Sequence, residues 1–148
     1  MRAALALALF AACTSGTSKQ DASKLYSATS QAITSAQAKA VASTTGVNLD
    51  YTGPCDAEGS YHVTGIEDTT AGTFDLRVAF TNCVSTTRVA LDGDIHYAAS
   101  PTDGTLTGSM AFSDRTTSAM CDLDLHFSLS GGAAIYAGTV CGYDIGTF

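Results

Sequence analysis

Charged residues are scarce in this chain of 148 residues, and cations are the scarcer kind. Asp, Glu, Lys and Arg make up 14% of the sequence, with seven basic residues against 14 acidic ones and a net charge of −7. A protein that binds nucleic acid needs a basic surface to meet the phosphates. The composition does not provide one, so we expect no nucleic-acid partner.

Long apolar runs are also missing. A membrane-spanning helix needs about 20 consecutive apolar residues, and no stretch approaches that length. Tryptophan is absent and there are only two prolines, yet 45% of the residues are apolar. That content argues against a chain that is disordered throughout, and the length fits one compact domain.

Familiar motifs of catalysis and cofactor binding do not occur either. The sequence has no Gly-x-Ser-x-Gly turn, no phosphate-binding glycine loop and no dinucleotide fingerprint. Cys-x-x-Cys pairs, which are typical of structural zinc sites, are absent as well. We therefore expect no cofactor.

What is present begins at the N-terminus. Met1 and Arg2 form a short positive segment, and residues 3–12 are an unbroken apolar run. A helix of this length spans about 15 Å, half of a bilayer core, so the run suits an export signal better than a membrane anchor. It ends in Leu9-Phe10-Ala11-Ala12-Cys13, which is followed by the polar residues 14–18.

This segment resembles the signal of bacterial lipoproteins. The resemblance implies a signal peptide over residues 1–12, cleavage before Cys13, a lipid on the Cys13 sulfur and a polar tether over residues 13–18. Phe10 departs from the leucine usual in that family, and the signal is short. Thr14 in place of aspartate implies sorting to the outer membrane, if the host has two membranes. The expected partner is then the membrane, reached through this anchor.

The number of cysteines favours lipidation over an ordinary cleaved signal. The chain has five, and an odd number in an exported protein leaves one thiol over unless it is otherwise modified. Lipidation of Cys13 leaves an even four, Cys55, Cys83, Cys121 and Cys141, for disulfides.

Residues 19–43 have the period of a helix, within a segment that we bound at 19–45. One narrow apolar stripe recurs at steps of three and four residues: Leu25, Ala28, Ala32, Ile33, Ala36, Ala40 and Val41. Ser18 and Asp21 have the spacing of a capping box, and Gly46 follows the end. Because the stripe is mostly alanine, the helix needs a surface to pack against.

After the helix the apolar period changes from 3.6 to 2, which predicts an antiparallel β domain over residues 46–148. Six strands are expected between Tyr61 and Tyr143, with a possible seventh at 47–51. Pairing Leu76 with Gly93, Leu91 with Phe112 and Gly108 with Leu125 turns all apolar residues to one face.

The same pairing argument predicts the disulfides. A turn centred on Gly131 places Cys121 opposite Cys141 and Phe127 opposite Ile135. Cys55 and Cys83 are one residue out of line, and a bulge near Gly59 would correct this. We therefore predict Cys55–Cys83 and Cys121–Cys141.

A sheet with one apolar face must bury that face. We predict a mainly β (α+β) fold, in which a curved antiparallel meander of six or seven strands holds the N-terminal helix in its concavity. A closed barrel with the helix outside is the alternative.

Two predicted strands repeat Asp-x-Asp-x-His on the polar face: Asp92, Asp94 and His96, and Asp122, Asp124 and His126. These are possible metal ligands. An intervening strand separates the triplets by about 9.5 Å, too far for both to hold one ion. A solvated sheet face whose charges discourage edge pairing explains them better.

These features support three hypotheses of function. The first is a membrane-tethered lipoprotein with a non-catalytic structural or binding role at the cell envelope. The second is a carrier of a small apolar ligand, which requires a cavity between helix and sheet. The third is a metal-assisted hydrolase that uses the two Asp-x-Asp-x-His strands, which requires a cleft on the polar face.

Overall fold

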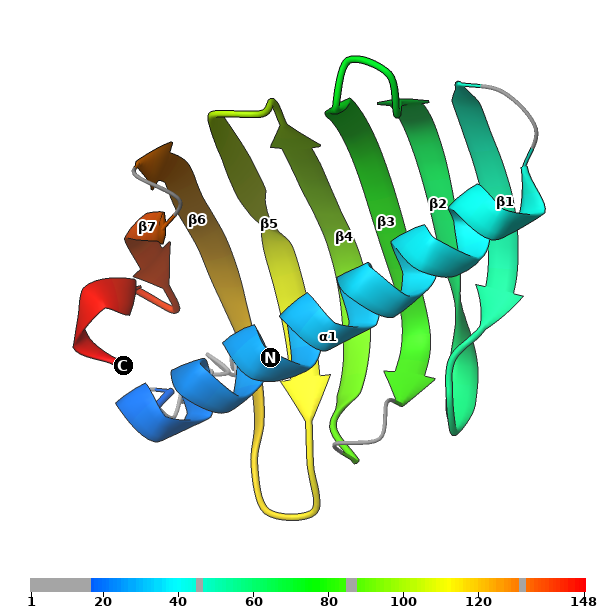
Figure 1. The fold of residues 1–148 in the computed structure, drawn as a ribbon. Helices are drawn as coiled ribbons and strands as arrows, with labels where there is room; N and C mark the ends of the chain where they lie inside the picture. The colour runs from blue at the N-terminus through cyan, green and yellow to red at the C-terminus, as the bar shows by residue number, and fades with distance from the viewer. Residues whose placement is uncertain (1–16, 45–46, 85–87, 131–132) are drawn as a thin grey trace, which may run out of the picture.

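The protein folds as one helix packed across one face of an antiparallel sheet (Figure 1). The computed structural model describes residues 17–44, 47–84, 88–130 and 133–148. The predicted signal peptide, Cys13 and Gly46 lie outside these residues. The elements, in chain order, are α1 (Lys19–Ser43), β1 (Asn48–Pro54), β2 (Glu58–Asp68), β3 (Thr73–Val84), β4 (Ala90–Ala99), β5 (Asp103–Ser113), β6 (Ser118–Ser130), β7 (Ala133–Val140), β8 (Tyr143–Asp144) and the 3-10 helix η1 (Ile145–Thr147).

Helix α1 begins and ends as its sequence indicates. The Ser18 side chain accepts a hydrogen bond from the Asp21 backbone N–H, and the Asp21 carboxylate accepts one from the Ser18 backbone N–H, which completes the predicted capping box. The buried face contains the predicted leucine, isoleucine and four alanines, with Ala22 and Thr29 in addition. Alanine side chains are small, so the helix backbone lies close to the sheet.

The sheet is an open meander. Its eight strands follow one another in space in the order β1 to β8, and each neighbouring pair is antiparallel. The predicted fold class is confirmed, and the closed barrel is wrong because the sheet does not close. One more strand is present than the largest number expected, since the chain after Val140 turns back to form the two-residue β8.

Several predicted registers differ from the structure. Leu91 pairs with Phe112 as predicted, but Leu76 pairs with Tyr97 and Leu125 with Leu106. These two shifts amount to four and two residues, and an even shift leaves the same side chains on the same face. The predicted face of each apolar side chain on these strands is therefore correct, although the predicted partners are not.

The error at β7 is one residue and has a larger consequence. Phe127 pairs with Tyr136 rather than with Ile135. Tyr136 therefore lies on the concave face, and Ile135, predicted to be inside, is 55% exposed on the other face. Gly131, the predicted centre of this turn, lies outside the described residues.

Both predicted disulfides are present. Cys55–Cys83 joins the β1–β2 turn to β3, with the two Cα atoms 5.5 Å apart. The register of β2 against β3 shifts between Glu58 and Ser60, and Gly59 has a φ of 80°. This is the expected bulge, at a backbone conformation that favours glycine. Cys121–Cys141 joins β6 to the end of β7, with Cα atoms 4.6 Å apart.

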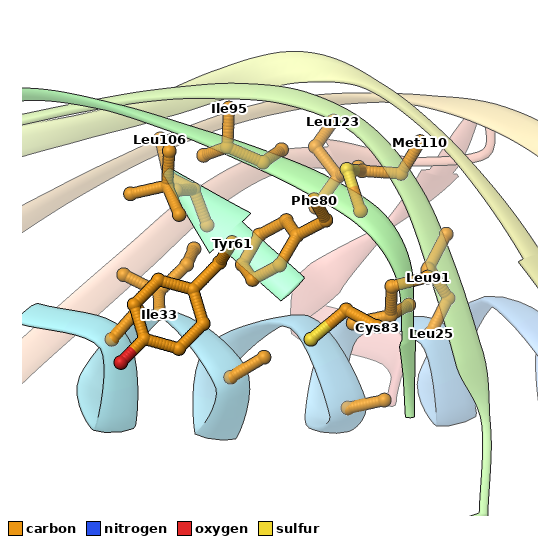
Figure 2. Close-up of a cluster of buried hydrophobic side chains, with 14 of the residues drawn as sticks. Leu25, Ile33, Tyr61, Phe80, Cys83, Leu91, Ile95, Leu106, Met110 and Leu123 are labelled. Atoms are coloured by element: carbon orange, nitrogen blue, oxygen red, sulfur yellow. The ribbon is translucent and has the colours of Figure 1, made fainter. Parts of the chain in front are cut away.

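The core lies between α1 and the concave face of the sheet (Figure 2). Leu25 of the helix and Leu91, Ile95 and Met110 of the sheet are all fully buried there. Within the part of the chain that the structure describes, no helix has the length and the apolar composition needed to span a membrane.

Candidate functional site

The two Asp-x-Asp-x-His triplets lie on the outer face of the sheet, away from α1. Strand β4 carries Asp92, Asp94 and His96, and β6 carries Asp122, Asp124 and His126. Strand β5 runs between them, so Asp94 and Asp122 both pair with Ser109 from opposite sides. The two strands are therefore two strand spacings apart, about 9.5 Å.

Neither triplet histidine lies near a carboxylate of the other triplet. His96 Nε2 is 2.6 Å from Asp75 Oδ1 on β3, while His126 Nε2 is 3.7 Å from Asp124 Oδ1 on its own strand. On the neighbouring part of the face, His62 Nε2 is 2.7 Å from Asp50 Oδ1. These side chains are exposed, and such pairs contribute little to stability.

The geometry does not bring the two triplets together. Among the described residues, no group of three or more His, Cys, Asp or Glu side chains is arranged to hold a metal ion. The predicted hydrolase site therefore gains no support from the arrangement of Asp92, Asp94, His96 and the equivalent residues of β6.

The concave face offers a different arrangement. Helix α1 crosses the strands diagonally, from the β6–β7 side at its N-terminus to β1 at its C-terminus (Figure 1). A diagonal helix cannot cover a whole sheet, so one corner of the concave face, over the ends of β3–β7 near the β4–β5 turn, extends beyond it. We call this region the aromatic corner and define it by Phe74, Tyr97, Phe127 and Tyr136.

The four rings of the aromatic corner form a continuous row across the sheet. The ring centroids of Phe74 and Tyr97 are 4.5 Å apart, those of Tyr97 and Phe127 are 6.2 Å apart, and those of Phe127 and Tyr136 are 6.0 Å apart. Aromatic pairs at these separations attract one another beyond their area of contact.

Strand β5 contributes no ring to this row but makes it possible. Its residue at that level is Gly104, which pairs with Phe127. A Cβ atom at Gly104 would lie 2.1 Å from Phe127 Cζ, so the phenylalanine ring occupies the space of the missing side chain. The glycine therefore lets the rings of β4 and β6 approach each other over β5.

A cavity of about 180 Å³ opens between the aromatic corner and the helix. Its apolar part is formed by Ile33 of α1 with Leu106 and Leu125 of the sheet, all at most 7% exposed. The rings of Tyr97, Phe127 and Tyr136 form one wall. Tyr26, Ser30 and Thr34 of the helix form the opposite one.

Two tyrosines of this cavity, Tyr97 and Tyr26, have pKa values above the ordinary one. Burial raises the pKa of Tyr97, and the neighbouring Tyr136 and Tyr26 raise it further. The pKa of Tyr26 is raised by burial and by Tyr136, while a hydrogen bond with Ser30 opposes the shift. Since tyrosine ordinarily ionises near pH 10, a further rise keeps the Tyr97 and Tyr26 hydroxyls uncharged at physiological pH.

A second cavity, of about 530 Å³, lies between the N-terminal half of α1 and the chain that connects β5 to β6, and most of its lining residues are polar or charged. Lys24, Arg88 and Arg115 line it together with Asp114. Lys24 Nζ is 3.5 Å from Asp114 Oδ2. Hydrogen bonds from Thr116 and Thr117 lower the pKa of Asp114 to about 2, with a smaller contribution from Lys24.

The aromatic corner was not predicted from the sequence. Its four rings come from four strands, and no spacing along the chain links them. One signal was available: Phe74 and Tyr97 stand at the ends of alternating apolar runs. The observed register places Gly104 beside Phe127 and Leu106 beside Tyr97, so Tyr97 and Phe127 lie diagonally across β5.

Comparisons of the chain with protein-family models, with curated proteins and with solved structures give no match.

Proposed function

We propose that the protein is an exported lipoprotein, anchored to a membrane through Cys13, whose β domain has a non-catalytic structural or binding role at the cell envelope. The observation that carries this proposal is the pairing of the cysteines. Four of the five cysteines of the chain form the two disulfides. Disulfides persist in oxidising compartments, which supports export.

The fifth cysteine is the residue that the lipoprotein-like signal marks for acylation. Cys13 follows the apolar run directly, and its thiol is not required by either disulfide. A single lipid chain binds a membrane only marginally, whereas two or more anchor it stably. The diacylglyceryl group implied by the signal would meet that requirement.

The start of the described chain is attached to one end of the sheet, which suits a tether that leaves the domain at a defined place. The Tyr143 hydroxyl donates a hydrogen bond of 2.8 Å to the Thr17 carbonyl oxygen. The Cys121 sulfur, in the β6–β7 disulfide, is 3.9 Å from the Thr17 hydroxyl oxygen. Only three residues separate Cys13 from Thr17.

Mass spectrometry of the protein extracted from membranes tests the proposal. We expect a mature chain that begins at an acylated Cys13 and contains both disulfides. In fractionation, Cys13→Ser should move the protein into the soluble fraction, and Ser15→Ala, a matched change two residues away, should leave it in the membrane. A Cys13→Ser protein that still requires detergent for extraction would contradict the tether.

A further inference from the structure

The cavity beside the aromatic corner has the chemistry of a ligand site. We propose that it binds a small neutral ring compound of the phenol class, a flat apolar ring bearing one hydrogen-bonding group. This inference rests on the binding role proposed above and gives that role a ligand. It does not depend on acylation of Cys13.

The size of the cavity sets the size of the ligand. A dry protein cavity of about 150 Å³ is known to accept a benzene molecule, and this one measures about 180 Å³. A single ring with one small substituent therefore fits.

The lining of the cavity selects for a neutral molecule. Among the described residues that line it, none is Asp, Glu, Lys, Arg or His. A charged ligand would lose its hydration there without meeting an opposite charge, which is strongly unfavourable. An uncharged ring loses no such hydration and gains contact with Ile33, Leu106 and Leu125.

The walls of the cavity determine how a bound ligand ring is oriented. The rings of Tyr97, Phe127 and Tyr136 present flat surfaces on one side, and a flat ligand ring can stack against them or meet them edge to face. On the other side the hydroxyls of Tyr26 and Ser30 provide hydrogen-bond donors and acceptors from the helix. Binding sites for small molecules combine such an apolar lining with a few polar groups.

The cavity is also accessible from solvent at the sheet edge. Tyr136 is 48% exposed, although its side chain lies on the concave face. The adjoining Phe127 and Tyr97 are half-buried. By contrast, the apolar residues under the helix are fully buried, so the aromatic corner is the part of the concave face that a ligand can reach.

A titration of the purified full-length protein with phenol, followed by the methyl resonances in NMR spectra, tests the proposal. We expect saturable shifts of the Ile33, Leu106 and Leu125 methyl signals, with those of Leu91 unmoved. Benzoate, a ring of similar size that is charged at neutral pH, should bind at least about 10-fold more weakly because of its desolvation.

Two variants and one control locate the binding. Ser30→Phe should fill the cavity and abolish the shifts caused by phenol. Gln31→Phe introduces the same ring on the exposed side of the helix and should preserve these shifts. Tyr136→Ala, which removes a wall at the sheet edge, should weaken phenol binding independently of Ser30.

The outcomes separate cleanly. Methyl signals that do not move, equal affinity for phenol and benzoate, or unchanged binding by both Ser30→Phe and Tyr136→Ala would each overturn the ligand site. None of these results bears on the tether, which the fractionation of Cys13→Ser tests by itself.

Discussion

The concave face has two parts that use different means to cover apolar surface. Under the diagonal of α1, the helix presents alanines and single larger residues, and the sheet side chains beneath it are fully buried. In the aromatic corner beyond the helix, four aromatic rings cover the sheet themselves and remain half-exposed. Tight packing under the helix stabilises the fold, whereas the corner keeps a cavity open.

The largest expected difference between the two parts concerns stability. Leu25→Ala should lower the free energy of unfolding by about 3 kcal/mol, because Leu25 is fully buried and its loss leaves a cavity. Tyr136→Ala removes a larger side chain from the corner but should cost less than about 1 kcal/mol, since Tyr136 is 48% exposed. Urea denaturation measures both values. An equal loss of unfolding free energy in both variants would contradict the difference between the packed core and the aromatic corner.

Gly104→Ala tests how the corner is built. The new Cβ atom would collide with the Phe127 ring, which must then move away from β5 and toward the cavity. We expect a loss of about 1–2 kcal/mol, typical of overpacking, together with weaker binding of phenol. A variant with wild-type stability and wild-type ring contacts in NMR spectra would show that the glycine is not needed.

Thr29→Val should improve the packing under the helix. Thr29 is fully buried against the sheet, and its hydroxyl has no hydrogen-bond partner among the described residues. Valine has nearly the same shape without the polar atom, so stability should rise by about 1 kcal/mol. Thr34→Val is the matched control on the same helix, because the Thr34 hydroxyl is exposed and bonds to the Ser30 carbonyl oxygen. A loss of stability in Thr29→Val would point to an unseen partner for the hydroxyl.

Asp114 lies outside both parts of the concave face. Of the substitutions considered, Asp114→Asn should change the free energy of unfolding least. Its pKa is lowered from 3.8 to about 2 in the folded protein by the hydrogen bonds from Thr116 and Thr117. A depressed native pKa contributes stability that is present above the unfolded value and is lost as the pH falls through the native one. Asp114→Asn should therefore reduce the loss of stability between about pH 4 and pH 2, measured by denaturation at each pH. An unchanged acid dependence would contradict these contacts.

Most of the fold could be predicted from the sequence because its strongest signals are local. The Ser18–Asp21 capping box and the alanine stripe determined the helix, and the alternation of apolar residues determined which side chains face it. Disulfide pairing followed because Cys121 and Cys141 flank one hairpin. An even error in register preserves the faces, so these predictions were insensitive to the wrong pairings of β3 with β4 and of β5 with β6.

The aromatic corner and the place of Ile135 could not be predicted, because both depend on the register itself. The β3–β4 register shifts between Phe80 and Cys83, at a point where Asn82 has a φ of 44°. No turn or glycine signal in the sequence marks this irregularity. The β6–β7 pairing is offset by one residue, and that odd shift moved Tyr136 to the concave face in place of Ile135.

The most direct test of the account is the set of contacts between helix and sheet measured by methyl NOEs in solution. If α1 lies along the diagonal, the Leu25 methyl groups should show NOEs to methyl groups of the buried sheet residues, and Ile33 should show them to Leu106 or Leu125 at the border of the cavity. Spectra in which Leu25 and Ile33 lack NOEs to the sheet would contradict both the packed core and the cavity beside it.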